Sequence, residues 1–341
     1  MPMQPPARPC PDWVDAAWEA LAAKASFSMR PRPWGHGLPL CDQPAAPSLA
    51  PRSVVFGISS DYGDGLLLQL LRSGHAPAAL VTSTRFGHAP AGSFYQQAAQ
   101  RLGIPLLAGE NVHQPEILSV IGALRPDLIW VFSFDQIFRP ALLDIPRLGM
   151  VNFHPSRLPA WRGPEPIWWQ IASGETESGL TASRVTEGID AGPILARSRE
   201  PVRATDSSGS LTRRLLLGAG PVIEQVLAQA RAGRLEGPLP DLSAGSYQSG
   251  VIGPRLDFSR PAVELERIVR AGLPDHPATV EDLDGRRFRV REARVVPKPA
   301  EAAPGTLLAL DPTGQTLTFA AGVDALVMVC SSPSGARARF A

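Results

Sequence analysis

Asn152 and His154 are the residues of this sequence whose types and spacing best suit catalysis. They lie two positions apart, and the apolar run 148–153 around them stops at Pro155. On an extended strand this spacing places both side chains on one face, and a proline ends the strand. The pattern therefore predicts an amide and an ionisable imidazole where a strand gives way to a loop, which in open α/β sheets is where ligands bind.

A carboxylate follows in the segment 187–193, where Asp190 lies between Gly188 and Gly192. Glycines tolerate tight and left-handed backbone, so this loop can fold closely around a ligand. Taken singly, the three polar residues have simpler interpretations: a structural histidine, an asparagine that forms a turn and a solvated aspartate. Taken together and in this order, they favour a catalytic interpretation.

The segment 150–195 resembles the folate-dependent formyltransferases. The matching residues are Asn152, His154, Pro155, Ser156, Leu158, Pro159, Arg162, Gly163, Pro166, Gly174, Glu175, Gly179, Thr181, Asp190, Ala191 and Gly192. Many positions in one order make a specific signal. The resemblance extends from about residue 53 to the C-terminus and does not cover the first 50 residues.

The resemblance implies a reaction and three catalytic residues. The family moves a formyl group from N10 of the co-substrate 10-formyltetrahydrofolate to an amine. Asn152 would donate a hydrogen bond to the oxyanion, and His154 would accept or deliver a proton. Asp190 would orient His154 or hold a water molecule that relays protons.

The resemblance also implies residues that contact the folate and the acceptor. The expected folate contacts are Gln136, Ile137, Phe138, Glu187, Gly188, Ile189 and Gly192. The expected substrate loop contains Ser156, Arg162 and Gly163, although Ser156 can equally cap backbone groups of the loop. Ile137 and Phe138 can also be core residues under the loop, and polar Asp135 and Gln136 depart from the apolar residues or glycines expected of some members.

Strands and helices alternate over most of the chain, which predicts a Rossmann-like α/β domain with a parallel-rich sheet. The expected strands are 53–58, 78–82, 104–107, 127–132, 150–153 and 181–185, and the expected helices are 66–72, 94–102, 114–124, 168–172 and 208–231. The turn after the first strand lacks the GxGxxG spacing, so no dinucleotide site is expected.

A second domain is expected beyond the Gly-, Pro- and Ser-rich segment 233–253. The segment 256–262 is expected to open a helix that runs to 271. Short strands at 278–283, 288–296, 306–310, 316–320 and 325–330 then predict a small β-barrel. This part resembles the OB-like C-terminal domain of methionyl-tRNA formyltransferase. The predicted domains are a Pro/Ala-rich N-terminal extension at 1–50, with a helix near 13–24, a catalytic domain at 51–240 and the barrel at 252–341.

Composition narrows the class of protein. Among 341 residues, 44% are hydrophobic and 19% charged, as in soluble globular proteins. Cys10, Cys41 and Cys330 are widely separated, which argues against a disulfide framework or zinc site and predicts a cytoplasmic protein. The six histidines lack metal-ligand spacing, so no metal is expected. No apolar run approaches the ~20 residues that span a bilayer, so no membrane association is expected.

The identity of the acceptor stays open among three classes. The net charge of +1 and a loop at 82–93 whose charges are Arg85 and His88 disfavour tRNA, because phosphate binding needs several basic contacts. Arg287, Arg289 and Arg291 share a strand face, which is either solvated or basic enough for phosphates. We therefore expect a small-molecule or carrier-bound amine, with methionyl-tRNA as the alternative and a folate-binding, non-catalytic partner protein as a second alternative.

Overall fold

The computed structural model describes residues 12–23, 50–88, 91–250, 254–281, 287–311 and 315–331. The described residues form two compact units. The first unit contains the described residues up to Ala160 together with Gly179–Arg199 and Arg213–Gly245. The second contains Trp161–Ser178, Glu200–Thr212 and the described residues from Ser246 onward.

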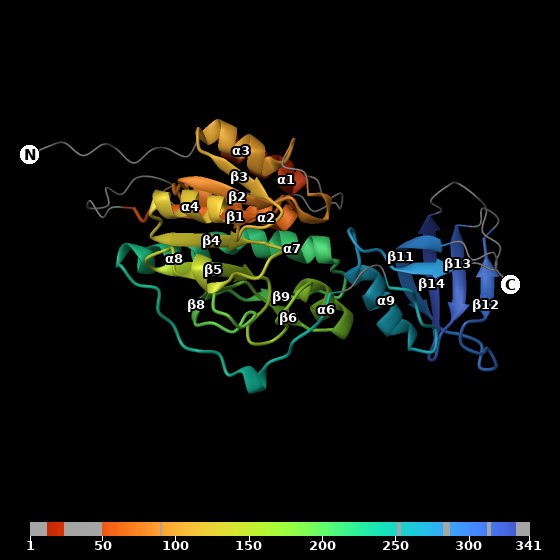
Figure 1. Ribbon diagram of the computed structural model, residues 1–341. Helices are drawn as coiled ribbons and strands as arrows, with labels where there is room; N and C mark the ends of the chain where they lie inside the picture. The colour runs from red at the N-terminus through yellow and green to blue at the C-terminus, as the bar shows by residue number, and fades with distance from the viewer. Residues whose placement is uncertain are drawn as a thin grey trace, which may run out of the picture. The chain divides into compact units, whose positions relative to one another are not determined.

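A seven-stranded sheet with the order β3-β2-β1-β4-β5-β7-β8 forms the centre of the first unit (Figure 1). Its strands are β1 (Ser53–Gly57), β2 (Ala79–Ser83), β3 (Leu106–Gly109), β4 (Leu128–Phe132), β5 (Gly149–His154), β7 (Thr181–Arg184) and β8 (Ile194–Arg197). The first five are parallel, whereas β7 is antiparallel to β5 and β8 to β7. The strand order reverses between β1 and β4, which is the kind of crevice where ligands bind in such sheets. The predicted fold class is confirmed.

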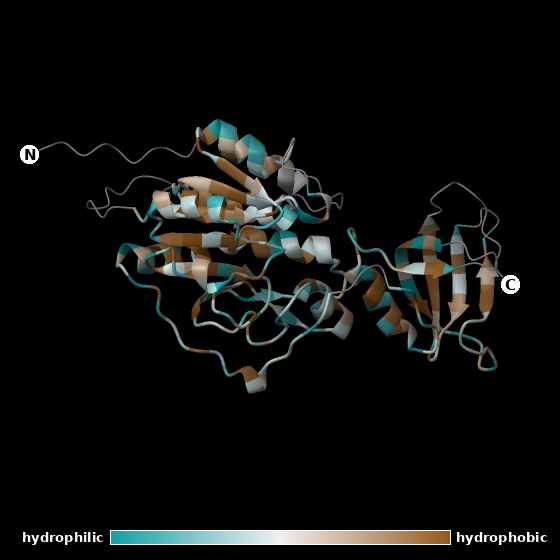
Figure 2. Ribbon diagram, in the orientation of Figure 1, coloured by the Kyte–Doolittle hydropathy of each residue, from teal (hydrophilic) through white to brown (hydrophobic). Residues whose placement is uncertain are grey.

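Apolar side chains cover both faces of this sheet, as the alternation along β1 shows. Val55 belongs to one core, whereas Val54 and Phe56 belong to the other, because successive residues of a strand point to opposite faces. The first core includes α1 (Asp12–Ala23), α2 (Asp61–Arg72), α3 (Phe94–Leu102) and α8 (Ala219–Arg231), and the second includes α4 (Pro115–Leu124) and α5 (Pro140–Leu143). Figure 2 shows the strands between these helices as largely apolar.

The helix α2 begins at Asp61, five residues before the expected start at 66. The Ser60 hydroxyl caps it by accepting a hydrogen bond from the Gly63 backbone N–H at 3.0 Å, which satisfies one of the unpaired N–H groups at a helix start. Gly65 lies so close to Leu216 of α7 (Ser208–Leu217) that a Cβ on it would sit 2.6 Å from the leucine side chain. Gly63 and Gly65 made this first turn look like a loop in the sequence, but in the structure both are helical residues that pack closely against their neighbours.

Several elements elsewhere in the chain also differ from expectation, among them α5 (Pro140–Leu143) and the two-residue strands at 177–178 and 200–201, which were not expected. The single helix expected at 208–231 is two helices, α7 (Ser208–Leu217) and α8, which meet at Gly218. The strand β8 was not expected, because its four residues follow Pro193 and give too short a pattern to recognise. A short 3₁₀ turn, η1 (Arg85–Gly87), lies in the loop after β2, and a second, η2 (Leu242–Ala244), lies in the expected linker.

The second unit contains an antiparallel five-stranded sheet of order β10-β11-β14-β13-β12 (Figure 1). Its strands are β10 (Thr279–Glu281), β11 (Arg287–Val296), β12 (Leu307–Leu310), β13 (Thr316–Ala320) and β14 (Ala325–Ser331). The helix α9 (Ala262–Ala271) packs against β11 and against α6 (Pro166–Ser173). The short strands β6 (Glu177–Ser178) and β9 (Glu200–Pro201) pair with each other.

The N-terminal helix α1 is anchored in the first core. Val14 is fully buried and Trp18 is 6% exposed. Asp15 forms an ion pair with Arg72 of α2, whose guanidinium also lies over the Trp18 ring. The rest of the expected N-terminal extension, including Cys10 and Cys41, lies outside the described residues. Among the helices of the described ranges, none is both long and apolar enough to cross a bilayer.

Candidate functional site

The strand β5 places Asn152 and His154 at the carboxyl end of the sheet. Its pairing with β4 ends at Asn152, whereas its antiparallel pairing with β7 continues to His154, which lies opposite Thr181. The two side chains therefore share one face, as the two-residue spacing predicts. Pro155 follows directly and lacks the N–H group that would continue the ladder.

Asp190 reaches the same place from the loop between β7 and β8. Its own backbone is left-handed, with φ of +49°. Gly192 is required where the loop folds back, because a Cβ there would sit 1.8 Å from the Arg184 carbonyl oxygen. The glycine therefore permits the close approach that brings the carboxylate to β5.

The three side chains meet through the carboxylate. Asn152 Nδ2 donates a hydrogen bond to Asp190 Oδ1 at 3.0 Å, and His154 Nδ1 lies 3.5 Å from Asp190 Oδ2. The side chains of His154 and Asp190 are only 6% and 10% exposed. The structure thus brings an amide donor, an imidazole and a carboxylate together in a largely water-excluded place, where hydrogen bonds and charges act more strongly than in water.

Sequence reasoning missed Tyr62, which lies in the first turn of α2. Its hydroxyl donates a hydrogen bond at 2.9 Å to the carbonyl oxygen of Phe153, the residue between Asn152 and His154. Burial, and secondly the nearby negative charge of Asp190, raise the pKa of Tyr62 well above its ordinary value of 10. No pattern in the sequence distinguishes this tyrosine from any other polar residue in a helical first turn.

The loop at 134–138 is fixed by polar side chains. The Gln136 side chain accepts from the Val112 backbone N–H at 3.1 Å and donates to Ser83 Oγ at 3.2 Å. Ser83 Oγ donates in turn to Asp135 Oδ2 at 3.0 Å. The polar residues that depart from the family pattern therefore tie this loop to the ends of β2 and β3.

Two of the three expected folate contacts in this loop differ sharply in exposure. Phe138 is a core residue, 8% exposed, and its ring packs against Phe56 and Phe134. Ile137 is 66% exposed, and its carbonyl oxygen lies 2.9 Å from the Nε2 atom of His113. Of the two apolar residues, only Ile137 has a surface that a ligand could cover.

The loop at 187–192 is open to solvent on its outer side. Glu187 and Gly188 are exposed and Ile189 is 42% exposed, whereas Gly192 is buried. An exposed apolar residue thus lies directly before the carboxylate that meets Asn152 and His154.

The expected substrate loop divides between the two units. Ser156 is fully buried in the first unit, where its hydroxyl donates to the Ala160 carbonyl oxygen at 2.7 Å, so it shapes the loop. Arg162 and Gly163 belong to the second unit. There the Arg162 backbone exchanges hydrogen bonds of 3.0 Å with Ser246 and Gln248, and a Cβ on Gly163 would sit 2.4 Å from the Gln248 carbonyl oxygen.

A hollow of about 340 Å³ lies beyond the carboxyl ends of β1 and β2 in the first unit. It is lined by Ile58, Ser59, Thr82, Gly87, His88, Ala91, Gly92 and Ser93. Ser59 is held there by its hydrogen bonds to Asp64, at 3.0 and 3.1 Å. The hollow lies at the end of the sheet where such folds bind ligands.

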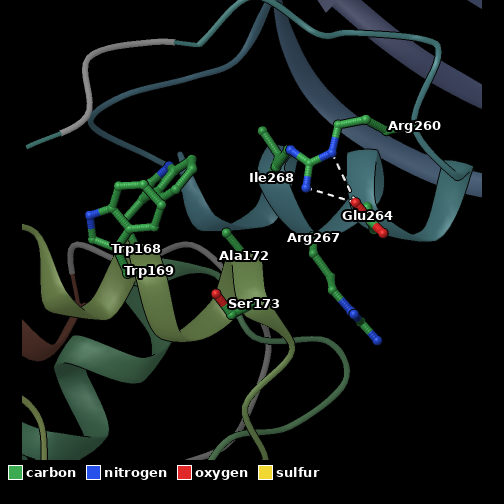
Figure 3. A pocket seen from close by; sticks show the side chains of 8 residues that line it. All are labelled: Trp168, Trp169, Ala172, Ser173, Arg260, Glu264, Arg267 and Ile268. Atoms are coloured by element: carbon green, nitrogen blue, oxygen red, sulfur yellow. Dashed lines mark hydrogen bonds and ion pairs between the residues drawn. The ribbon is translucent and has the colours of Figure 1, made fainter. Parts of the chain in front are cut away.

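A second hollow of about 340 Å³ lies within the second unit, between α6 and α9 (Figure 3). Trp168 and Trp169 form one wall, and Arg260, Arg267 and Ile268 line the opposite side. Its one carboxylate, Glu264, is paired with Arg260 at 2.7 Å. The lining contains no histidine, so this hollow offers no counterpart to the imidazole and carboxylate on β5.

No group of three metal-ligating side chains that could hold an ion occurs among the residues that the structure describes.

Two protein-family models match most of the chain. The model described as "Formyl transferase" matches residues 68–227, and the one described as "Formyl transferase, C-terminal domain" matches residues 254–335. This chain belongs to the formyltransferase family. The family expected from residues 150–195 is thereby confirmed, and the protein is a formyltransferase by class.

Relatives with assigned names cover most of the chain. A protein of Pseudomonas fluorescens (strain SBW25) named methionyl-tRNA formyltransferase is 36% identical over 84% of this chain and 91% of its own length. A protein of the same name from Ectopseudomonas mendocina is 36% identical over 80% and 87%. The crystal structure of an N-formyltransferase from Helicobacter canadensis in complex with folinic acid and dTDP-3-aminofucose has a TM-score of 0.63 at 16% identity, covering 82% of this chain and 99% of that one. This last likeness supports the fold.

Proposed function

We propose that this formyltransferase moves the formyl group of 10-formyltetrahydrofolate onto a primary amine. The observation that carries the proposal is the convergence of Asn152 and His154 on the Asp190 carboxylate at the carboxyl end of the sheet. We also propose functional domains at 51–240 and 252–341, which the matched ranges 68–227 and 254–335 support.

The three side chains divide the chemistry of acyl transfer. Attack of the amine on the formyl carbon gives the formyl oxygen a negative charge and leaves the amine with a surplus proton. The Asn152 amide donates to that oxygen, which is worth about 2.7–4 kcal/mol in the transition state. His154 accepts the proton from the amine and returns one to the departing N10. Asp190 holds the imidazole by its Nδ1 side and stabilises its charged form.

The residues around the site fit a reduced folate. Ile137 and Ile189 are exposed apolar side chains on the two loops that the family resemblance assigns to the pterin. Covering them with a flat ring would remove apolar surface from water. The fixed backbone at 134–138, held by Gln136 and Asp135, offers polar groups to the ring edge. The Helicobacter canadensis enzyme was solved with folinic acid, a related folate.

For the acceptor, we propose methionyl-tRNA first, which revises the preference drawn from the sequence. The relatives from Pseudomonas fluorescens and Ectopseudomonas mendocina carry that name and align over nearly their whole length. Exposed arginines on β11 could contact phosphates: Arg287, Arg289, Arg291 and Arg294. A β-bulge between Val290 and Glu292 interrupts the pairing of β11 with β14 at Arg291.

A small-molecule or carrier-bound amine is the second candidate, and one observation favours it. The loop after β2 offers Arg85 as its one arginine. The Arg85 guanidinium donates to the Asp135 carbonyl oxygen at 3.5 Å and lies over the Phe86 ring. These contacts, one with the loop at 134–138 and one with its own loop, leave the guanidinium less available to bind a tRNA phosphate.

A direct assay tests the proposed activity. Purified protein is mixed with 10-formyltetrahydrofolate and either charged initiator tRNA or a panel of amines. Release of tetrahydrofolate is followed optically, and the N-formyl product is identified by its mass. We expect turnover that falls at least about 100-fold in His154→Ala. Tight folate binding without turnover on any acceptor would instead favour the non-catalytic alternative.

Salt dependence separates the two acceptor classes. Affinity for tRNA falls steeply between about 50 and 200 mM salt, because each phosphate contact releases counterions. If methionyl-tRNA is the acceptor, its KM rises steeply over this range, and replacing Arg287 and Arg289 with Gln reduces the slope. Efficient formylation of a small amine with no activity on charged tRNA would reverse our order of acceptors.

A further inference from the structure

The carbonyl group between the two proposed catalytic residues of β5 is held from outside the sheet. Pairing of β5 with β4 ends at Asn152, so the backbones of Phe153 and His154 are not part of that ladder. At this point the Tyr62 hydroxyl donates to the Phe153 carbonyl oxygen at 2.9 Å. The tyrosine therefore supplies a bond to the strand tip beyond the end of its pairing with β4.

The rotation of this peptide group matters to both neighbouring side chains. The Phe153 carbonyl belongs to the peptide unit that continues into His154, and Asn152 precedes it on the strand. A turn of this unit would swing the imidazole and the amide relative to Asp190, which holds Asn152 at 3.0 Å and faces His154 at 3.5 Å. Hydrogen bonds of this kind weaken steeply with misalignment.

The hydroxyl of Tyr62 is also a dependable donor. Its raised pKa keeps it protonated at any pH at which the enzyme would work, because burial and the Asp190 charge both oppose ionisation. Tyr62 packs, partly buried, against the first core at the start of α2, a helix anchored by the Ser60 cap and by a row of buried leucines. A rigid helix thus fixes the position of the donor.

We propose that Tyr62 is a positioning residue for the transfer reaction: by holding the Phe153 carbonyl, it keeps Asn152 and His154 aligned with Asp190. The inference rests on the proposed function of those three residues. It predicts that loss of the hydroxyl slows the chemical step rather than weakening folate binding, because Tyr62 acts through the backbone of β5.

Tyr95 provides a matched control. It is a fully buried tyrosine of α3 whose hydroxyl likewise donates to a backbone carbonyl, that of Gly63, at 3.4 Å. Its pKa is raised in the same way, by burial and by Asp64. It bonds to α2 and not to β5, so Tyr95→Phe removes a comparable hydroxyl without releasing the strand tip.

Kinetics of the two variants test the proposal. We expect Tyr62→Phe to lower kcat about fivefold to tenfold, the worth of one hydrogen bond, with the KM for 10-formyltetrahydrofolate within about twofold of wild type. Tyr95→Phe is expected to keep kcat within about twofold. Placing 4-aminophenylalanine at position 62, which restores a donor, should recover most of kcat. Wild-type kcat in Tyr62→Phe, an equal loss in Tyr95→Phe, or no recovery with the amino analogue would each overturn the proposal.

A second measurement does not depend on turnover. Hydrogen exchange of the peptide covering residues 150–158, followed by mass spectrometry, should quicken in Tyr62→Phe and not in Tyr95→Phe, because the strand tip opens more often. Unchanged exchange in Tyr62→Phe would refute the holding of β5 by Tyr62. If wild type shows no formyl transfer but the exchange result holds, the proposed function fails and the role of Tyr62 in fixing the strand survives.

Discussion

At the residue scale, Asp190 is the group on which the other two proposed catalytic side chains depend. It accepts a hydrogen bond from Asn152 through one oxygen and faces His154 through the other. A neutral amide in its place could still meet one neighbour, but it would not stabilise an imidazolium. Replacing Asp190 with asparagine therefore tests the contribution of its negative charge while nearly keeping the shape of the side chain.

We predict that Asp190→Asn lowers kcat about 100-fold, the typical worth of a general acid–base group. The change is nearly isosteric, so we expect the protein to fold normally. Asp127→Asn is the control, because Asp127 precedes β4 at the opposite end of the sheet, where it accepts from Arg52 and Arg147. Steady-state kinetics that show equal losses in both variants would argue against a special role for Asp190.

The sequence could indicate some of these contacts but not all. The spacing of Asn152 and His154 predicts a shared strand face, because period 2 is a local property. The approach of Asp190 from 36 positions further along was implied by the family resemblance, not by local pattern. The bond from Tyr62 to Phe153 joins residues 91 positions apart, and nothing local marks either partner.

At the element scale, the loop between β7 and β8 exists in its present form because of Gly192. A methyl group there would sit 1.8 Å from the Arg184 carbonyl oxygen, which belongs to the backbone of β7 and cannot swing away. Any shift of the loop to relieve this clash moves Asp190, two residues earlier. The position of Asp190 in the site thus depends on the close backbone contact between Gly192 and Arg184.

We predict that Gly192→Ala destabilises the protein by more than about 1 kcal/mol and lowers kcat/KM more than Asp190→Asn does. Gly122→Ala is the control: it lies inside α4, where an added Cβ meets nothing within 4 Å. There alanine should stabilise the helix by about 0.5–1 kcal/mol. Urea unfolding and kinetics on both variants check the pair, and a Gly192→Ala protein with normal stability and turnover would contradict it.

The helix α1 is a second element with a clear energetic role. Trp18 is 6% exposed in the first core and lies under the Arg72 guanidinium at 5.8 Å. We predict that Trp18→Ala costs about 3–5 kcal/mol of unfolding free energy, as large-to-small core changes do, while the folded fraction keeps its turnover. Glu19→Ala, on the exposed side of the helix, should stay within about 0.5 kcal/mol of wild type.

Elements formed by long apolar runs were predictable, whereas those interrupted by glycines or formed by very short runs were not. β1, β2, β4 and β5 were located to within one or two residues, because buried parallel strands read as continuous apolar runs. The start of α2 was missed because Gly63 and Gly65 suggest a turn, although both pack closely in the helix. β8 and the break between α7 and α8 depend on tertiary packing, which overrides local propensity.

At the scale of the whole molecule, a buried histidine outside the site links stability to pH. His75 is 5% exposed, and its Nε2 atom lies 2.7 Å from Ser53 Oγ. Burial, and secondly the charge of Arg231, lower its pKa from 6.5 to about 4. The folded protein therefore keeps His75 neutral under mildly acidic conditions in which an unfolded chain would protonate it.

This difference predicts a loss of stability in acid. Above pH 6.5 both states are neutral at His75, so it adds no pH dependence; as the pH falls towards 4, only the unfolded state gains the proton. The unfolding free energy should drop by about 3 kcal/mol over this window because of His75. His75→Gln should remove that part of the slope, whereas His88→Gln, at an exposed position, should keep it. Urea titrations at pH 7.5 and 4.5 measure the difference, and a His75→Gln protein with the wild-type slope would show that another group carries it.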